Sequence, residues 1–573
     1  MENDVSKNRR LLYQKMDDYF DESTYSSNYL LEKENENLKL RKKKIFSTLL
    51  SKRKEAFKSN EDNFINHDLE IDITKLKCDE EIKNDVNNYI KTKFEIKSWF
   101  KYLFSSNKNE NLVSLFLIRR YIELQVTEIK ETEKRVLSRN NTELIQRLVD
   151  NLLSDDLKII YNSCACLTNL MLFPSHIENR IYSEKNLEKI LKFFNVLYNN
   201  ISVFGYNSLG FYLNLTFNEN VIIYFVKNSF LENFYNFLNN IINNKINFEK
   251  EKFELNTIVI CIQILFNLLR ITHIDDNYSK KFFPFISICK YITSKYYVNI
   301  DNSIFDENKS INLINIWEIF SKNRNEKELF VNEIIKDSFV KVLFLLYNKI
   351  KKIENKIIMT KIFSDLVSIS DKENEILIND GIIEFLVGEI ERYQYSNVKL
   401  LSNIIFACMN LGLGTLGQIE MLFKSGIIFK IIDITNFYIN DKLDKELNEL
   451  LVISLLCLGN IIMGGHPEVN KSIIIYNKST IVSIFCNALK LGLDPLNRQN
   501  LIEKIIFSFY ELNVVSEELE PDIEKEYDIM LINNALEELL NNLSNKKFID
   551  NATKDSIERN IEFIKAKEKE KNL

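Results

Sequence analysis

Glycine and proline are scarce in this chain, which has 12 Gly and 5 Pro among 573 residues, and no Gly occurs before Gly205. Tight hairpin turns rely on Gly, and so do the phosphate-binding turns of dinucleotide folds. The scarcity argues against an all-β or Rossmann-type chain of this length. Hydrophobic residues make up 45% of the chain, enough for a continuous core. We therefore predict an all-α chain in which polar segments connect the helices.

Residues typical of catalytic and metal sites are also sparse. The eight Cys are scattered without a CxxC pair, and the four His are equally dispersed. Buried, reduced Cys residues are typical of a cytosolic or nuclear protein. No Walker A motif occurs, and Gly412, Gly414 and Gly417, although spaced like a glycine loop, are expected in a helix–turn between repeats. We expect no metal, no cofactor and no enzymatic activity.

Neither a signal peptide nor a membrane span is expected. The N-terminus is polar and charged, unlike a secretory signal. The longest apolar run that the sequence suggests lies near residues 258–269 and is shorter than a bilayer span requires.

Charge is distributed unevenly. The net charge is −6, yet residues 1–60 contain 14 Lys and Arg against 10 Asp and Glu. Within them, residues 38–54 hold eight bases and no acid, in two clusters separated by an apolar spacer. Leu38, Ile45 and Leu49 are spaced for one helical face. This basic arm before an acidic body favours a partner for the arm, contact between arm and body, or nucleic-acid binding.

One theme recurs between about residues 81 and 545: an amphipathic helix, a polar break and a more apolar helix. The most apolar helix carries an Asn or a small polar substitute at intervals of 44 to 54 residues. We call these the landmark positions: Asn169, Asn214, Asn267, Ser321, Asp365, Asn410 and Asn460. The interval falls at and slightly above the range of armadillo and HEAT repeats, which stack helix pairs or triplets into a solenoid.

Two explanations fit the landmark positions. A polar side chain in an apolar helix can tie adjacent helices together as a satisfied core group. Alternatively, the same helix of each repeat lines the concave groove of a solenoid, where Asn amides clamp the backbone of an extended peptide. The sequence leaves both open.

Several stretches resemble the importin-alpha family, the adaptors that carry cargo with nuclear-localisation signals. Leu40-Arg41-Lys42-Lys43-Lys44 followed by Leu49-Leu50-Ser51-Lys52-Arg53-Lys54 is similar to the importin-beta-binding segment of that family. Residues 410–433 resemble a glycine-containing repeat signature, and residues 263–291 resemble the fourth repeat. Residues 532–548 resemble the closing repeat.

The resemblance extends from about Arg9 to Ile564 and implies a right-handed superhelical armadillo-repeat solenoid of about ten repeats with a flexible basic N-terminal arm. It implies an arm at 1–60, a linker at 61–80, repeats at 81–550 and a charged tail at 551–573. The implied partners are importin-beta and cargo proteins, and the implied localisation is the cytoplasm and nucleus. The bases implied to contact importin-beta are Lys39, Arg41, Lys42, Lys43, Lys44, Lys52, Arg53 and Lys54.

The implied peptide groove departs from the family pattern. Family members place a Trp four residues before each groove Asn, where the ring holds the stem of a cargo Lys. Here only Trp317 matches; the residues four before the Asn landmarks are Ala165, Gly210, Gln263, Phe406 and Leu456. Lys361, before Asp365, stands where the family has an Arg before an Asn. Asn218 stands where the family has Asp, so one cargo-Lys pocket lacks its counter-charge. The implied groove residues are Asn169, Asn214, Asn267, Arg270, Trp317, Ser321, Lys361, Asp365, Phe406, Asn410 and Asn460.

These departures leave alternatives. Trp317 lines the groove or fills a helix interface, and Arg270 contacts peptide or a neighbouring acid. Phe406 replaces one Trp in part, because a Phe face attracts cations less strongly. We expect an import adaptor that binds basic signals in its groove and importin-beta through its arm. The alternatives are a divergent armadillo scaffold for other peptides and, less favoured, a nucleic-acid binder or a solvated basic arm.

Overall fold

The structure is a computed structural model, and it describes most of the chain after residue 101. The described residues are 102–125, 141–171, 181–205, 208–246, 251–273, 278–299, 307–323, 326–440, 444–476, 480–490, 495–516, 529–543, 558–559, 561–562 and 565. They are helical or lie in short connections, and none of them is in a β-strand. The all-α prediction is confirmed for this part of the chain. The predicted arm at 1–60 and linker at 61–80 lie outside the described residues.

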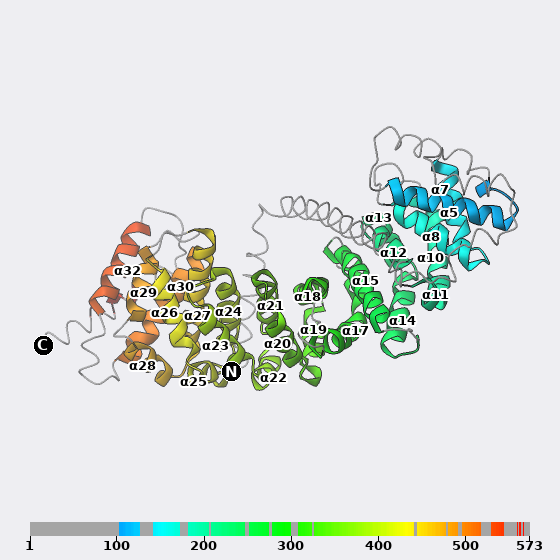
Figure 1. Cartoon of the computed structure of the whole chain (residues 1–573). Helices are drawn as coiled ribbons and strands as arrows, with labels where there is room; N and C mark the ends of the chain where they lie inside the picture. Colours follow the sequence, from blue (N-terminus) through cyan, green and yellow to red (C-terminus); the bar gives the residue numbers. More distant parts are fainter. Residues whose placement is uncertain are drawn as a thin grey trace. The chain divides into compact units, whose positions relative to one another are not determined.

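Two compact units make up the described chain (Figure 1). The N-terminal unit contains the described residues up to Asn299 together with Asn308–Ile316. The C-terminal unit contains Glu307 and the described residues from Trp317 onward. The division therefore falls within one helix, α18 (Glu307–Lys322).

Helices in the N-terminal unit recur in sets of three. Its elements are α5 (Lys108–Gln125), α7 (Asn141–Asn151), α8 (Leu157–Leu170), α10 (Glu184–Asn199), α11 (Ile201–Phe204), α12 (Leu209–Leu215), α13 (Glu219–Lys227), α14 (Phe230–Ile242), α15 (Glu251–Leu269), η4 (Arg270–His273), α16 (Ser279–Phe282), α17 (Phe285–Ile292) and η6 (Thr293–Val298). The third helices stack in order: α8 on α5, α12 on α8 and α15 on α12.

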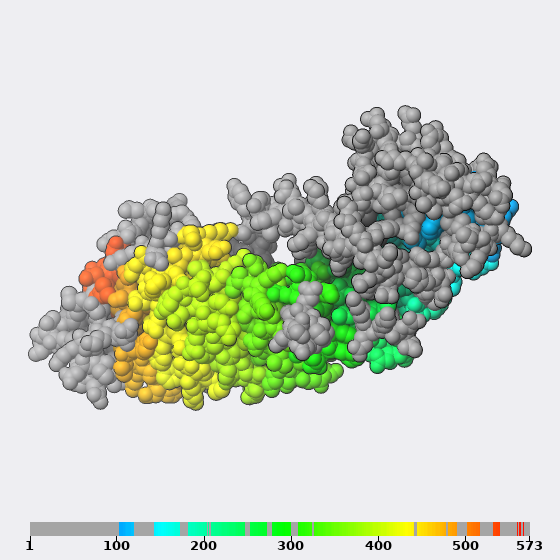
Figure 2. All heavy atoms as spheres, in the orientation of Figure 1, coloured from blue at the N-terminus to red at the C-terminus, as the bar shows by residue number. Residues whose placement is uncertain are grey.

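The C-terminal unit repeats the same arrangement. Besides its part of α18 it contains α19 (Lys327–Ile335), η8 (Lys336–Ser338), α20 (Phe339–Lys349), α21 (Ile353–Leu366), α22 (Asp371–Asn379), α23 (Ile382–Tyr393), α24 (Val398–Leu411), α25 (Leu416–Lys424), α26 (Ile427–Tyr438), α27 (Lys445–Gly464), α28 (Pro467–Ile475), α29 (Thr480–Lys490), α30 (Pro495–Ser516) and α32 (Ile529–Leu543). Here α24 stacks on α21, α27 on α24 and α30 on α27. Figure 2 shows successive repeats of this unit as adjacent bands of colour.

In three repeats of the C-terminal unit the tight turn between the first and second helix uses residues in the left-handed region. Gly381 (φ 96°) and Gly426 (φ 76°) supply this conformation before α23 and α26. In the preceding repeat the turn uses Asp337 (φ 59°) and Ser338 (φ 53°), which costs more because both have a Cβ. The Ser338 hydroxyl donates to Asp380 Oδ1 at 2.8 Å, which helps to hold this conformation.

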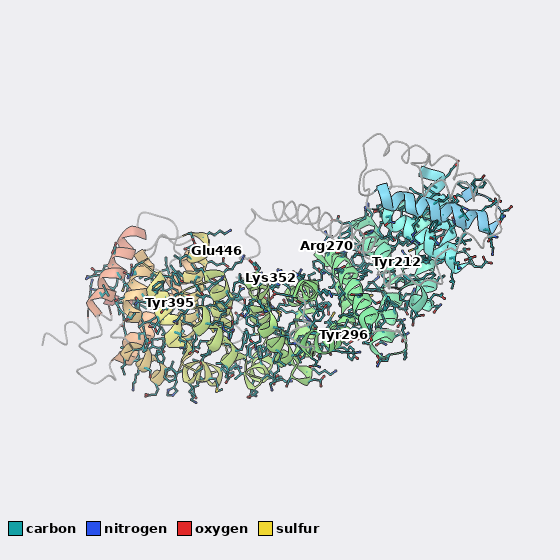
Figure 3. All side chains as sticks on the ribbon, in the orientation of Figure 1. Tyr212, Arg270, Tyr296, Lys352, Tyr395 and Glu446 are labelled. Carbon is teal, nitrogen blue, oxygen red and sulfur yellow. The ribbon has the colours of Figure 1, made fainter. Side chains whose placement is uncertain are left out.

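Aromatic rings fill the core of the N-terminal unit. Tyr212 in α12 is completely buried, and its hydroxyl donates to the carbonyl of Ile190 at 2.7 Å (Figure 3). Around it, Phe225 and Phe230 stack with ring centroids 4.4 Å apart. Burial raises the pKa of Tyr212 well above its ordinary value, so this hydroxyl stays neutral.

α27 forms a longer apolar helix than we expected from the sequence. Among the described helices it has the length and composition of a membrane span, and the bent pair α28–α29 passes the same test only if both count as one span. Within α27, 78% of the apolar window is buried inside the structure, as expected for the core helix of a repeat. The expectation that the run near 258–269 is the longest is wrong. The longer run lies in α27, where Ser454, Gly459 and Asn460 interrupt the apolar residues and make the run hard to recognise in the sequence.

Trp317 lies in the core of the C-terminal unit, with 0% of its surface exposed. Its ring packs against Phe320 and Phe330, each 6.2 Å away between centroids, and against Phe339 at 5.6 Å. The predicted groove position is therefore corrected. The ring fills the interface of α18 with α19 and α20, because the short α19–α20 turn brings Phe330 and Phe339 to it, while Phe320 lies on α18 itself.

Replacing Trp317 by Ala should destabilise the C-terminal unit by about 3–5 kcal/mol, the usual cost of removing a large buried ring. We expect a lower denaturation midpoint in urea, followed by circular dichroism of the full chain. The control is Tyr395→Ala, which removes an aromatic ring that is 49% exposed. Equal midpoints for the two variants would contradict the core position of Trp317.

Candidate functional site on the third helices

The third helices carry the landmark side chains at one equivalent place near their C-terminal ends. In the N-terminal unit they are Asn169 in α8, Asn214 in α12 and Asn267 in α15. In the C-terminal unit they are Ser321 in α18, Asp365 in α21, Asn410 in α24 and Asn460 in α27. All the Asn landmarks are buried, with at most 8% of the residue exposed.

Hydrogen bonds connect the landmarks of neighbouring repeats in the N-terminal unit. Asn214 Nδ2 donates to the carbonyl of Thr168 at 3.0 Å, next to the Asn169 landmark. Asn267 Nδ2 donates to Thr216 Oγ1 at 3.1 Å, two residues after the Asn214 landmark. Each amide therefore reaches back to the third helix of the repeat before it.

The same ladder runs through the C-terminal unit. Asn410 Nδ2 donates to the carbonyl of Ser364, and Asn460 Nδ2 donates to the carbonyl of Met409, both at 3.4 Å. Between α18 and α21 the Ser321 hydroxyl donates to Asp365 Oδ2 at 2.8 Å. The explanation that the landmarks tie adjacent helices together is confirmed. Peptide clamping stays a prediction.

A second inter-repeat bond lies seven residues before two of the landmarks. Asn403 Nδ2 in α24 donates to the Ile357 carbonyl at 3.0 Å and to Thr360 Oγ1 at 3.2 Å. In α8, Asn162 Oδ1 accepts from Arg119 Nη1 at 3.1 Å. Sequence reasoning missed both residues, although their spacing of two helical turns from a landmark was a usable signal.

The row four residues before the landmarks, which we call the contact row, is the accessible one in most repeats. Ala165, Gly210, Gln263, Lys361 and Phe406 are half-buried, whereas Trp317 and Leu456 are buried. The N-terminal unit presents small or polar residues in this row and so offers no ring to a ligand. The C-terminal unit presents Lys361 and Phe406. No described residue of the contact row therefore forms the Trp slot of the importin-alpha pattern.

Two further residues take local roles. Arg270 is half-buried and begins the short helix η4 that continues α15 (Figure 3). Asn218 is the N-cap of α13, where its Oδ1 accepts from the N–H of Val221 at 3.3 Å. A short polar side chain at this position accepts a hydrogen bond from the N–H groups at the helix start, and Asn and Asp do so equally well.

The edge of the C-terminal unit where third helices begin is also polar. The backbone N–H of Lys352 donates to the Glu307 carboxylate at 3.0 Å, which satisfies the start of α21. Lys352 and Glu446, at the beginnings of α21 and α27, lie along one edge of this unit in Figure 3.

The described residues offer little for catalysis. No group of three or more His, Cys, Asp or Glu among them is placed to hold a metal ion. Burial raises the pKa of the Cys164 thiol to about 12, so this thiol stays protonated and unreactive. Gly412 and Gly414 lie in the turn between α24 and α25, and Gly417 lies inside α25. This is the predicted helix–turn arrangement, without a preceding strand.

No protein-family model and no curated protein sequence matches this chain. Solved structures do. An engineered protein is 12% identical, with a TM-score of 0.53 over 82% of this chain and 99% of its own. A chain from a study of the phosphorylation switch that controls the interaction between cadherin and beta-catenin is 12% identical. Its TM-score is 0.53 over 86% of this chain and 99% of its own.

A designed armadillo repeat protein matches 48% of this chain over 99% of its own, at 13% identity and a TM-score of 0.36. The chain has an armadillo-repeat fold. At these identities the likeness to solved structures shows the fold alone. The resemblance of the sequence to importin-alpha is a more specific prediction, which these matches do not test.

The ladder gives a stability prediction. Asn410→Ala removes the donor to the buried Ser364 carbonyl, which should cost about 1–3 kcal/mol. We expect a lower urea midpoint and faster hydrogen exchange in α21 and α24. Asn436→Ala is the matched control, because Asn436 is exposed on α26. If the Asn410→Ala variant were as stable as Asn436→Ala, the ladder bond would not stabilise the fold.

Proposed function

We propose that this chain is a protein-transport adaptor of the importin-alpha kind. Its third helices hold an extended peptide of a cargo protein, and its basic arm at 38–54 binds importin-beta for passage from cytoplasm to nucleus. The observation that carries the proposal is the regular landmark ladder beside a half-buried contact row. The buried landmarks keep the third helices in one register, and the contact row then offers one accessible residue in most repeats to an extended peptide.

The arm supports the importin-beta half of the proposal. Its two basic clusters, Lys39 to Lys44 and Lys52 to Lys54, contain no acid and keep the spacing of the importin-beta-binding segment. An acidic partner surface would make many modest ion pairs with them, so binding would weaken as salt increases. The fold itself is compatible with any peptide-binding scaffold.

The contact row indicates altered cargo recognition. With Trp317 in the core and no Trp at the equivalent positions, a cargo Lys finds no ring slot. Each lost cation–π contact is worth roughly 0.5–2 kcal/mol. The second candidate function, a scaffold for other peptides without a role in import, is favoured by the missing rings, because Ala165, Gly210 and Gln263 stand where the family has Trp.

The arm can be tested with the full chain and importin-beta by isothermal titration calorimetry at two salt concentrations. Changing Arg41, Lys42, Lys43, Lys52 and Arg53 together to Ala should weaken binding about ten-fold or more, because each exposed ion pair contributes roughly 0.2–1 kcal/mol. The matched control changes five other bases of residues 1–37 to Ala: Lys7, Arg9, Arg10, Lys15 and Lys33. Equal binding by both variants would contradict an importin-beta role for 38–54 and favour the scaffold.

The groove can be tested with a labelled basic signal peptide, titrated by fluorescence anisotropy. We expect weak binding to the unmodified chain. Gln263→Trp should restore one ring slot and raise the affinity by roughly 0.5–2 kcal/mol. Tight binding by the unmodified chain would overturn the altered recognition, and the conservative Gln263→Asn variant controls for the substitution itself.

A further inference from the structure

Two hydrogen bonds fix the register of α21 and α24 on either side of one pair of residues. Asn403 bonds to the carbonyl of Ile357, and Asn410 bonds to the carbonyl of Ser364. Each bond joins residues 46 apart, so the two helices keep one register over two turns. Lys361 and Phe406 belong to the contact row and fall between these bonds. They therefore occupy neighbouring positions on the third-helix face of the C-terminal unit.

This pair is accessible and combines two kinds of chemistry. Both side chains are half-buried, and so is Ile358, one turn before Lys361 on α21. The face thus offers an ammonium group beside an aromatic ring and an aliphatic side chain. We call these three residues the Lys361 slot.

The acids around the slot have other partners. Asp365, one turn after Lys361, accepts the hydrogen bond of the Ser321 hydroxyl at 2.8 Å. On α18, Glu318 pairs with Lys322 at 2.6 Å. Glu318 is thus neutralised within α18, whereas Asp365 keeps its charge, and no described carboxylate forms an ion pair with Lys361.

We propose that the Lys361 slot selects an extended peptide with an acidic residue next to an aromatic or aliphatic one. The carboxylate of the peptide pairs with the Lys361 ammonium, and the apolar side chain covers Phe406 and Ile358. A Lys at the same peptide position meets a like charge, which rejects it. This inference rests on the proposed function and names the peptide class for the C-terminal unit.

The test uses the full chain and three labelled peptides of one length, with Glu-Phe, Gln-Phe or Lys-Phe at the centre of a Gly/Ser sequence. Fluorescence anisotropy at low salt should rank them in that order, with about ten-fold between the Glu and Lys peptides, since a partly exposed charge pair acts in both directions. Lys361→Glu should reverse the order. Lys372→Glu makes the same charge change at an exposed position of α22 and should leave the order unchanged.

The outcomes separate this inference from the proposed function. If the three peptides bind equally, and Phe406→Ala and Asn410→Ala still weaken that binding, the third helices bind peptide and the acidic preference is wrong. If Lys361→Glu leaves the ranking unchanged, the preference has another source and the slot is wrong. If no peptide binds, or binding survives Phe406→Ala and Asn410→Ala, peptide binding by the third helices is itself overturned. Circular dichroism confirms that each variant is folded.

Discussion

The hydrogen bond from one landmark to the third helix of the preceding repeat is the constraint on which the third-helix face depends. A buried amide without a partner is costly, and the amides of four landmarks find an acceptor on the neighbouring helix: Asn214, Asn267, Asn410 and Asn460. Asn214 in the N-terminal unit and Asn410 in the C-terminal unit both donate to the carbonyl of the residue just before the previous landmark. Stacking of apolar helices alone would tolerate sliding, whereas these bonds allow one register.

Once the register is fixed, residues four before each landmark come into one row. What that row can bind then depends on side chains that contribute little to the fold. Gly210 and Ala165 give the contact row of the N-terminal unit no large side chain. Lys361 and Phe406 give the contact row of the C-terminal unit a charge and an aromatic ring. Recognition can therefore change in evolution while the ladder is kept. The residues that set the register and the residues that can face a ligand are therefore different ones.

The scarcity of Gly has a structural cost. Where Gly381 and Gly426 turn the chain without strain, the equivalent turn before α20 uses Asp337 and Ser338 in the left-handed region. The surrounding contacts maintain it: Ser338 bonds to Asp380, and Lys341 pairs with Asp380 at 3.0 Å. The same turn positions α19 and α20 around Trp317. Trp317 is thus part of the core beside the turn that lacks Gly.

The sequence by itself determined the all-α class, the repeat interval and the landmark positions, because helical periodicity and a recurring polar residue are local patterns. It also marked the rows that share a helix face with the landmarks. It did not determine which neighbour covers each face. Only the tertiary structure decided that Trp317 faces three Phe rings while Phe406 stays accessible, although both precede a landmark by four residues. Likewise, only packing revealed Asn403 as a second tie and α27 as a buried core helix. Periodicity shows which residues share one face of a helix, whereas burial of that face depends on the helices that pack against it.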